Sequence, residues 1–90
     1  MAVQYTNITG QATTVVKPAA GILHAIILNN PVAAAVITIW DSLTASGSKI
    51  GTITVPAAPQ PVALRYDLNT NTGLTIQTAT ASSDITVIWE

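Results

Sequence analysis

The stretch that decides the fold is Val62-Ala63-Leu64-Arg65-Tyr66-Asp67-Leu68, in which large apolar side chains occupy every second position. In an extended chain these apolar side chains lie on one face, and Ala63, Arg65 and Asp67 lie on the other. The stretch therefore predicts a β-strand with one buried face.

The same reading extends to other parts of the chain. Residues 85–90 alternate in the same way, and 33 of the 90 residues are Thr, Ile or Val, which favour strands. The stretches 22–28 and 36–41 are largely apolar on both sides, apart from His24 in the first. We expect these two to be central strands covered on both faces.

Turn residues recur at the short intervals that are typical of a β-sandwich or barrel. Between them we expect about eight short antiparallel strands, at residues 3–8, 12–17, 22–28, 33–41, 49–55, 62–68, 74–80 and 84–90. A helical turn is the alternative for Ala33-Ala34-Ala35, because alanine favours helices. The sequence thus predicts an all-β fold, a single small β-sandwich or jelly-roll-like domain over residues 1–90. In one alternative, residues 1–10 form an extended N-terminal arm.

Charged side chains are scarce, at 8% of residues with a net charge of -1, against about 25% in an average domain. The only basic residues are Lys17, Lys49 and Arg65, too few to neutralise a run of phosphates, so we expect no nucleic-acid partner. A chain with so little charge tends to self-associate. We therefore expect much of its surface to be covered by copies of itself or by a larger partner.

Neither a targeting segment nor a membrane anchor is expected. The N-terminal residues lack the basic stretch followed by an apolar one that marks a secretory signal. The longest apolar runs fall far short of the ~20 residues of a membrane-spanning helix. We expect synthesis and folding in a cytoplasm, with no membrane partner.

Residues suited to catalysis or metal binding are few. The chain has one histidine and no cysteine, and its carboxylates are dispersed without ligand-like spacing. We interpret His24 as a structural or interface residue in an apolar setting. Asp41, Asp67 and Asp84 stand at strand ends or beside turns, where a short carboxylate can accept backbone N–H groups. We expect no enzyme, no metal and no cofactor.

The aromatic side chains are Tyr5, Trp40, Tyr66 and Trp89. Core packing is their usual role on strands, but two exposed together could stack on a sugar ring, which keeps a carbohydrate-binding module as an alternative. They could also anchor a protein interface. Strand addition by residues 2–8 is a further way to contact a neighbour, and prolines can blunt an edge. The interface residues that we expect are Val3, Tyr5, Trp40, Pro56, Pro59, Pro61 and Trp89.

A family resemblance is carried by four short segments, spread over nearly the whole chain from about Thr14. They are Gly21-Ile22-Leu23-His24-Ala25-Ile26, the run from Ile39-Trp40-Asp41 into Thr44–Ile50, Thr72-Gly73-Leu74-Thr75-Ile76, and Asp84-Ile85-Thr86-Val87. In their order the chain resembles the small all-β structural proteins of tailed bacteriophages, among them the capsid decoration (cement) proteins.

The resemblance implies a mechanical role. Decoration proteins bind the outer head, bridge neighbouring major capsid subunits and resist the pressure of the packaged DNA. For this chain it implies a virion location after synthesis in the host cytoplasm, with the major capsid protein and copies of itself, as a trimer or dimer, as partners. A tail, baseplate or fibre-associated structural module is the alternative in the same class. The resemblance carries over no catalytic residues.

Overall fold

The computed structural model describes residues 3–57 and 60–90, and strands are the only regular elements in this part of the chain. Eight strands are present, as the sequence predicts. They are β1 (Gln4–Ile8), β2 (Thr13–Lys17), β3 (Gly21–Asn30), β4 (Val36–Asp41), β5 (Ser48–Thr54), β6 (Val62–Thr70), β7 (Leu74–Ala79) and β8 (Asp84–Trp89).

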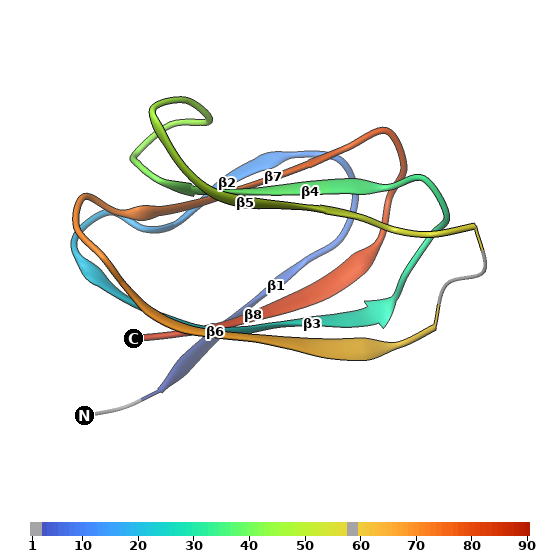
Figure 1. Ribbon diagram of the computed structural model, residues 1–90, viewed down its shortest axis with the longest axis horizontal. Helices are drawn as coiled ribbons and strands as arrows, with labels where there is room; N and C mark the ends of the chain where they lie inside the picture. The colour runs from blue at the N-terminus through green and yellow to red at the C-terminus, as the bar shows by residue number, and fades with distance from the viewer. Residues whose placement is uncertain (1–2, 58–59) are drawn as a thin grey trace.

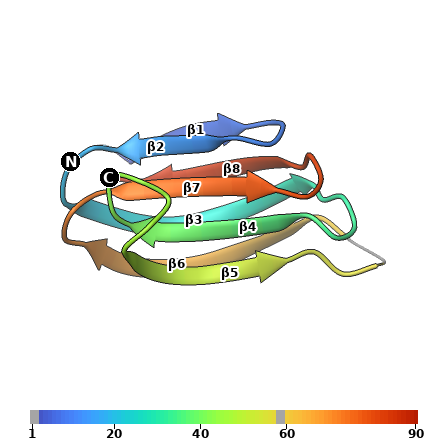
Figure 2. The ribbon, with the colours of Figure 1, turned by 90° about the horizontal axis from the view of Figure 1, so that it is seen from above.

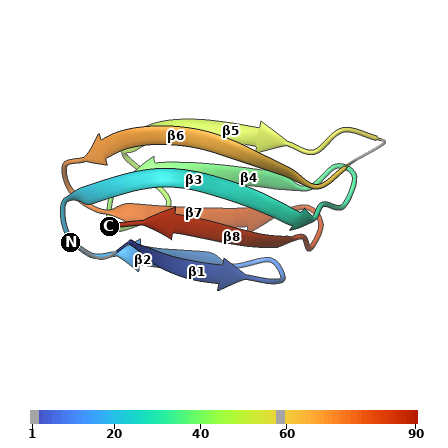
Figure 3. The same cartoon turned by 90° about the horizontal axis from the view of Figure 1, so that it is seen from below.

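The strands form two packed antiparallel sheets of four strands each (Figure 1). Sheet A has the order β1-β8-β3-β6, and sheet B has the order β2-β7-β4-β5. Figures 2 and 3 show β1 stacked on β2, β8 on β7, β3 on β4 and β6 on β5. Every connection except the β4–β5 hairpin crosses from one sheet to the other. This double winding is that of an eight-stranded jelly roll, so the predicted fold class is confirmed.

The core lies between the two sheets and follows the alternation of the sequence. Alternate side chains of each strand point inward, and the central strands contribute most of the fully buried ones. The buried apolar residues are Ile8, Val16, Leu23, Ile26, Leu28, Ala35, Ile37, Ile39, Val55, Leu74, Ile76, Ile85 and Val87.

Buried hydroxyl groups attach the connections to the sheets. Thr75 donates to the carbonyl of Ser42 at 2.7 Å, and Thr78 donates to the carbonyl of Gly10 at 2.7 Å. The hydroxyl of Ser83 accepts the backbone N–H of Val32. Burying a hydroxyl is costly unless it is hydrogen-bonded, so these contacts hold each connection in one position.

The expected strand at 33–41 starts later than the sequence predicts, at Val36. Residues 33–34 form a turn, closed by the N–H of Ala35 donating to the carbonyl of Val32, and Ala34 has a φ of 69°. The helical alternative for this segment is also wrong, because that φ lies in the left-handed region.

The central position of β3 and β4 is confirmed, but their covering on both faces is wrong. Each lies in the interior of its sheet. Only the inner face is covered, and outward side chains such as Val36, Trp40 and Ile27 remain half-exposed. A two-layer sandwich leaves the outer face of each sheet to solvent.

The N-terminal segment belongs to sheet A and does not form an extended arm. Residues Gln4 to Ile8 of β1 pair with Trp89 to Ile85 of β8 in an unbroken antiparallel register. The first described strand is thus joined to the last one.

The connections gather at two ends of the sandwich (Figure 1). The β1–β2, β3–β4, β5–β6 and β7–β8 connections lie at one end, on the right in Figure 1. The other three connections and both chain ends lie at the opposite end. This division places four loops, far apart in sequence, on one surface.

Candidate functional site

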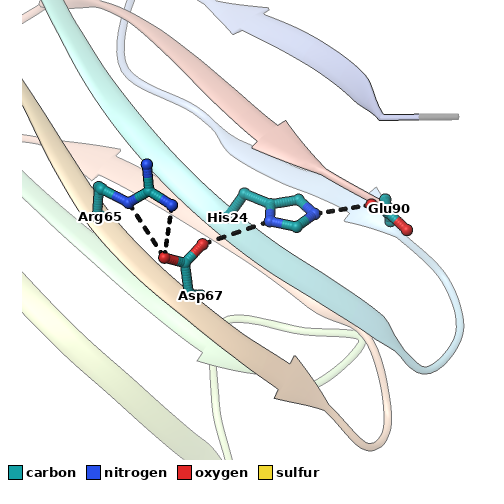
Figure 4. Close-up of polar contacts among 4 residues, drawn as sticks. All are labelled: His24, Arg65, Asp67 and Glu90. Carbon is teal, nitrogen blue, oxygen red and sulfur yellow. Dashed lines mark hydrogen bonds and ion pairs between the residues drawn. The ribbon is translucent and has the colours of Figure 1, made fainter.

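A polar cluster surrounds His24 on the outer face of sheet A, and it contains every ion pair found among the described residues (Figure 4). His24 is an extra residue in β3, because Leu23 pairs with Trp89 and Ala25 pairs with the adjacent Ile88. Such a β-bulge changes the direction of a side chain. The bulge brings the imidazole between β6 and the end of β8.

Two carboxylates meet the two ring nitrogens of His24. Nε2 lies 2.9 Å from Oε1 of Glu90, and Nδ1 lies 3.4 Å from Oδ1 of Asp67. Only the protonated imidazole can donate from both nitrogens. The bond to Glu90, and then the bond to Asp67, raise the pKa of His24 above its ordinary 6.5, although partial burial opposes them.

Arg65 completes the cluster from the same strand as Asp67. Its Nε and Nη2 donate to Oδ2 of Asp67 at 3.1 and 2.8 Å. This pairing, more than the contact with His24, lowers the pKa of the Asp67 carboxyl. Asp67 has a φ of 49°, a conformation that aspartate tolerates better than most residues.

This cluster can hold a proton, and it links strands β3 and β6 to the end of β8. Among the described residues, no group of three or more His, Cys, Asp or Glu side chains could hold a metal ion. The same part of the chain has no detectable pocket. The interpretation of His24 as a structural or interface residue stays a prediction. Its predicted apolar setting is wrong, because the carboxylates of Asp67 and Glu90 contact its ring.

The three aspartates differ from one another in their partners. Asp41 accepts the backbone N–H groups of Asn71 and Thr72 at 3.0 and 2.9 Å, and that of Gly73 at 3.3 Å, as the sequence predicts. These bonds, led by those from Asn71 and Thr72, lower the pKa of the Asp41 carboxyl. Asp41 thereby fixes the β6–β7 connection to the end of β4.

Asp67 and Asp84 do not have the predicted backbone partners. Asp67 binds Arg65 and His24, as described above. Asp84 accepts from the side-chain amides of Asn7 and Asn29 at 2.7 and 3.2 Å. The two contacts of Asp84 join β8 to its neighbours β1 and β3 on the outer face of sheet A. The sequence of a single strand cannot predict such contacts between strands.

The predicted interface residues lie in separate places. Val3 and Tyr5 are exposed at β1, on one lateral edge of the sandwich. Pro56 and Pro61 are exposed in the β5–β6 connection at the opposite edge, and Pro59 lies outside the described residues. The structure therefore places Val3 and Tyr5 at one edge and Pro56 and Pro61 at the other, and these four residues do not form one patch.

The two tryptophans lie on different sheets, and each has a lysine over its ring. Lys49 lies 6.0 Å from the ring centre of Trp40, and Lys17 lies 5.9 Å from that of Trp89. Trp89 also donates from Nε1 to the hydroxyl of Thr6. The two rings are half-buried, so they do not form the exposed aromatic pair that a sugar-binding face requires.

The end with four connections is a distinct surface, which we call the uncharged end. Its described residues are 9–12, 31–35, 55–57, 60–61 and 80–83, and none of them is charged. Most are exposed, and small residues and prolines predominate. Asp84, at the start of β8, is the nearest charge, and two asparagines engage its carboxylate.

Sequence reasoning missed both the His24 cluster and the uncharged end. The signal for the cluster is the polar content of two predicted strands, His24 in one and Arg65 with Asp67 in the other. The signal for the uncharged end is the position of charges at strand ends, because Lys17, Asp41, Lys49 and Glu90 all come to the opposite end and only Asp84 comes to this one. Neither signal can be interpreted until the order of the strands in the sheets is known.

Comparisons of the chain with known protein families, with curated proteins and with solved structures find no match. Among the described residues there is also no helix long and apolar enough to cross a membrane.

Proposed function

We propose that this chain is a structural protein of a tailed-phage virion, a decoration protein that binds the outer head and bridges major capsid subunits. It acts in many copies, through surface contacts and without catalysis. The short sequence segments named above support this proposal by resemblance. The jelly roll supports it by analogy only, since viral capsid domains use this architecture and so do unrelated proteins.

The uncharged end is the observation that carries the proposal. Charged residues are usually depleted at the centre of a protein interface, and this surface has none among its described residues. Small side chains from four connections offer a broad contact that costs little side-chain entropy, because alanine and proline lose almost none on burial. We infer that this end faces the capsid.

Backbone strain at the same end supports this inference. Ala34 and Thr80 have φ values of 69° and 72° and lie in the β3–β4 and β7–β8 connections. Left-handed conformations at such residues cost of order 1–3 kcal/mol and gather at functional surfaces. A loop selected only for stability would place glycine or asparagine there.

The opposite end holds the chain ends and most of the charged side chains. Lys17, Asp41, Lys49 and Glu90 lie at or next to strand ends on that side. A protein bound through its uncharged end would present these charges to solvent. That orientation would keep the surface of the decorated particle soluble.

The test is binding of the purified protein to expanded capsids, with two matched variants. Ala33→Glu places a charge on an exposed position of the uncharged end, and Ala19→Glu places the same charge on an exposed position of the β2–β3 connection at the other end. We expect cosedimentation of the wild-type protein and of Ala19→Glu with capsids, and loss of cosedimentation for Ala33→Glu.

Labelled protein located on virions by electron microscopy distinguishes the alternatives. Label on the head supports a decoration protein, whereas label confined to the tail would replace it with a tail or baseplate module. Failure to bind any part of the virion would reject the proposal. Equal binding of the two variants would reject the assignment of the uncharged end.

A further inference from the structure

The jelly roll has two lateral edges, where each sheet ends in a strand with one free side. Strands β1 and β2 form one edge, and β5 and β6 form the other (Figures 2 and 3). The free side of an edge strand exposes N–H and C=O groups that can pair with another chain, so proteins usually block it with charges, prolines or bulges.

The β5/β6 edge carries several of these blocking features. Lys49 lies on β5, and Arg65 and Asp67 lie on β6. The pairing of β5 with β4 has a register shift next to the Trp40–Lys49 pair. The pairing of β6 with β3 has a register shift between the Leu23–Leu68 and Ala25–Arg65 pairs. Exposed prolines precede β6 and follow β5. Pairing with another strand is disfavoured here.

At the other edge, strand β1 carries none of these features. Residues 3–16 contain no charged residue and no proline. β1 pairs with β8 without a register shift, whereas β2, on the same edge, has a shift between Val15 and Lys17. Of the four edge strands that the structure describes, β1 is therefore the one whose free side is both regular and uncharged.

Exposed apolar side chains mark the same edge. Tyr5 is 73% exposed and Val3 is 57% exposed at β1, and Val15 on β2 is 46% exposed. Tyr5 points away from the core, on the outer face of sheet A, beside Ile88 of β8. Cross-strand contacts of aromatic and branched side chains stabilise a sheet, so a strand added to β1 would gain contacts as well as hydrogen bonds.

We propose that β1 pairs in antiparallel fashion with β1 of a second copy of this chain, so that two A sheets form one continuous sheet. A second copy fits because a twofold axis places the same uncharged strand opposite itself. No like charges meet along residues 3–8, and the net charge of -1 gives little repulsion between whole molecules. The inference concerns the isolated chain and goes beyond capsid binding.

The test uses the purified chain with charges placed at position 5. We expect the wild-type protein to sediment as a dimer, while Tyr5→Lys and Tyr5→Glu each weaken association by about tenfold or more through like charges across the axis. An equal mixture of the two variants should restore association, because lysine then meets glutamate. The control is Val62→Lys, a similar change at an exposed residue of β6, which should leave the dimer intact.

Hydrogen exchange of the wild-type protein gives a second readout that needs no variant. Amides of β1 should exchange more slowly as the protein concentration rises, and amides of β6 should not change. A monomer at all concentrations, failure of the mixture to associate, or protection confined to β6 would overturn the proposal. Since no capsid is present, failure here leaves the proposed function standing, and failure of capsid binding leaves this dimer standing.

Discussion

Two carboxylates from different strands reach the ring of His24 and raise its pKa. Glu90 follows β8 and Asp67 lies on β6, whereas the imidazole comes from β3. The ring is only partly covered, so water screens each pair and the contribution to stability is modest. The cluster nevertheless makes the stability of sheet A depend on pH.

The direction of this dependence follows from the raised pKa of His24. A pKa that is higher in the folded than in the unfolded chain stabilises the fold fully below the ordinary value of 6.5, and this stabilisation is lost as the pH rises through the folded value. We expect the thermal midpoint of the wild-type protein to fall over this range. In His24→Gln the fall should be smaller, and an identical fall in both proteins would contradict the assignment.

Thr80 gives a second prediction for a single residue. Its φ of 72° strains a β-branched side chain, and asparagine tolerates this conformation better. We expect Thr80→Asn to raise the free energy of unfolding by about 0.5–1 kcal/mol, measured by urea denaturation. The control is Thr52→Asn on β5, where asparagine is unfavourable in a strand. A loss of stability in both variants would show that Thr80 is not strained.

At the scale of single elements, β3 requires a glycine at its start. A Cβ atom at Gly21 would collide with the backbone carbonyl of Glu90 and would lie 2.7 Å from Cδ of Lys17. At Gly51 on β5, the nearest atom would be the Tyr66 hydroxyl at 3.7 Å, an ordinary contact. We expect Gly21→Ala to destabilise the protein by about 1–3 kcal/mol and Gly51→Ala to have little effect. Equal midpoints in denaturant for the two variants would contradict this close approach.

Asp41 links two other elements, the end of β4 and the β6–β7 connection. Removing a charged acceptor of several backbone N–H groups costs about 1–3 kcal/mol, so we expect a loss of this size in Asp41→Ala. Asp41→Asn, which keeps one acceptor oxygen, should lose less stability.

Because the pKa of Asp41 is lowered in the folded protein, its contribution to stability is present above the ordinary pKa of 3.8 and is lost as the pH falls through the folded value. An acid denaturation curve unchanged in Asp41→Asn would contradict this role.

The strands themselves could be predicted because alternation is local. Leu64, Tyr66 and Leu68 pack toward the core as their spacing indicates, and Arg65 and Asp67 point outward. The contacts of His24 could not be predicted, since its partners lie 43 and 66 residues away. The start of β4 could not be predicted, because alternation does not show that Ala34 adopts a left-handed conformation.

At the scale of the whole molecule, charge is arranged by the winding of the chain. Successive turns alternate between the two ends of the sandwich. The charged residues at strand ends therefore divide unevenly, with Lys17, Asp41, Lys49 and Glu90 at the end that holds the termini and only Asp84 at the other. No single turn of the uncharged end is unusual for a β protein. Its character arises only when four turns, separated along the sequence, are brought together by the jelly roll.

The pairing of β1 with β8 has a consequence for how the protein is made. Gln4 lies opposite Trp89, so β1 has no partner in its sheet until β8 has been synthesised. Sheets that depend on such distant partners fold slowly. We expect a chain that ends at Ser83, without β8, to show no cooperative unfolding by circular dichroism.

In the cell, the uncharged β1 would remain without a partner until β8 has been synthesised, and unpaired strands are prone to aggregate. Expression should therefore be limited by nascent chains that meet one another before β8 is complete.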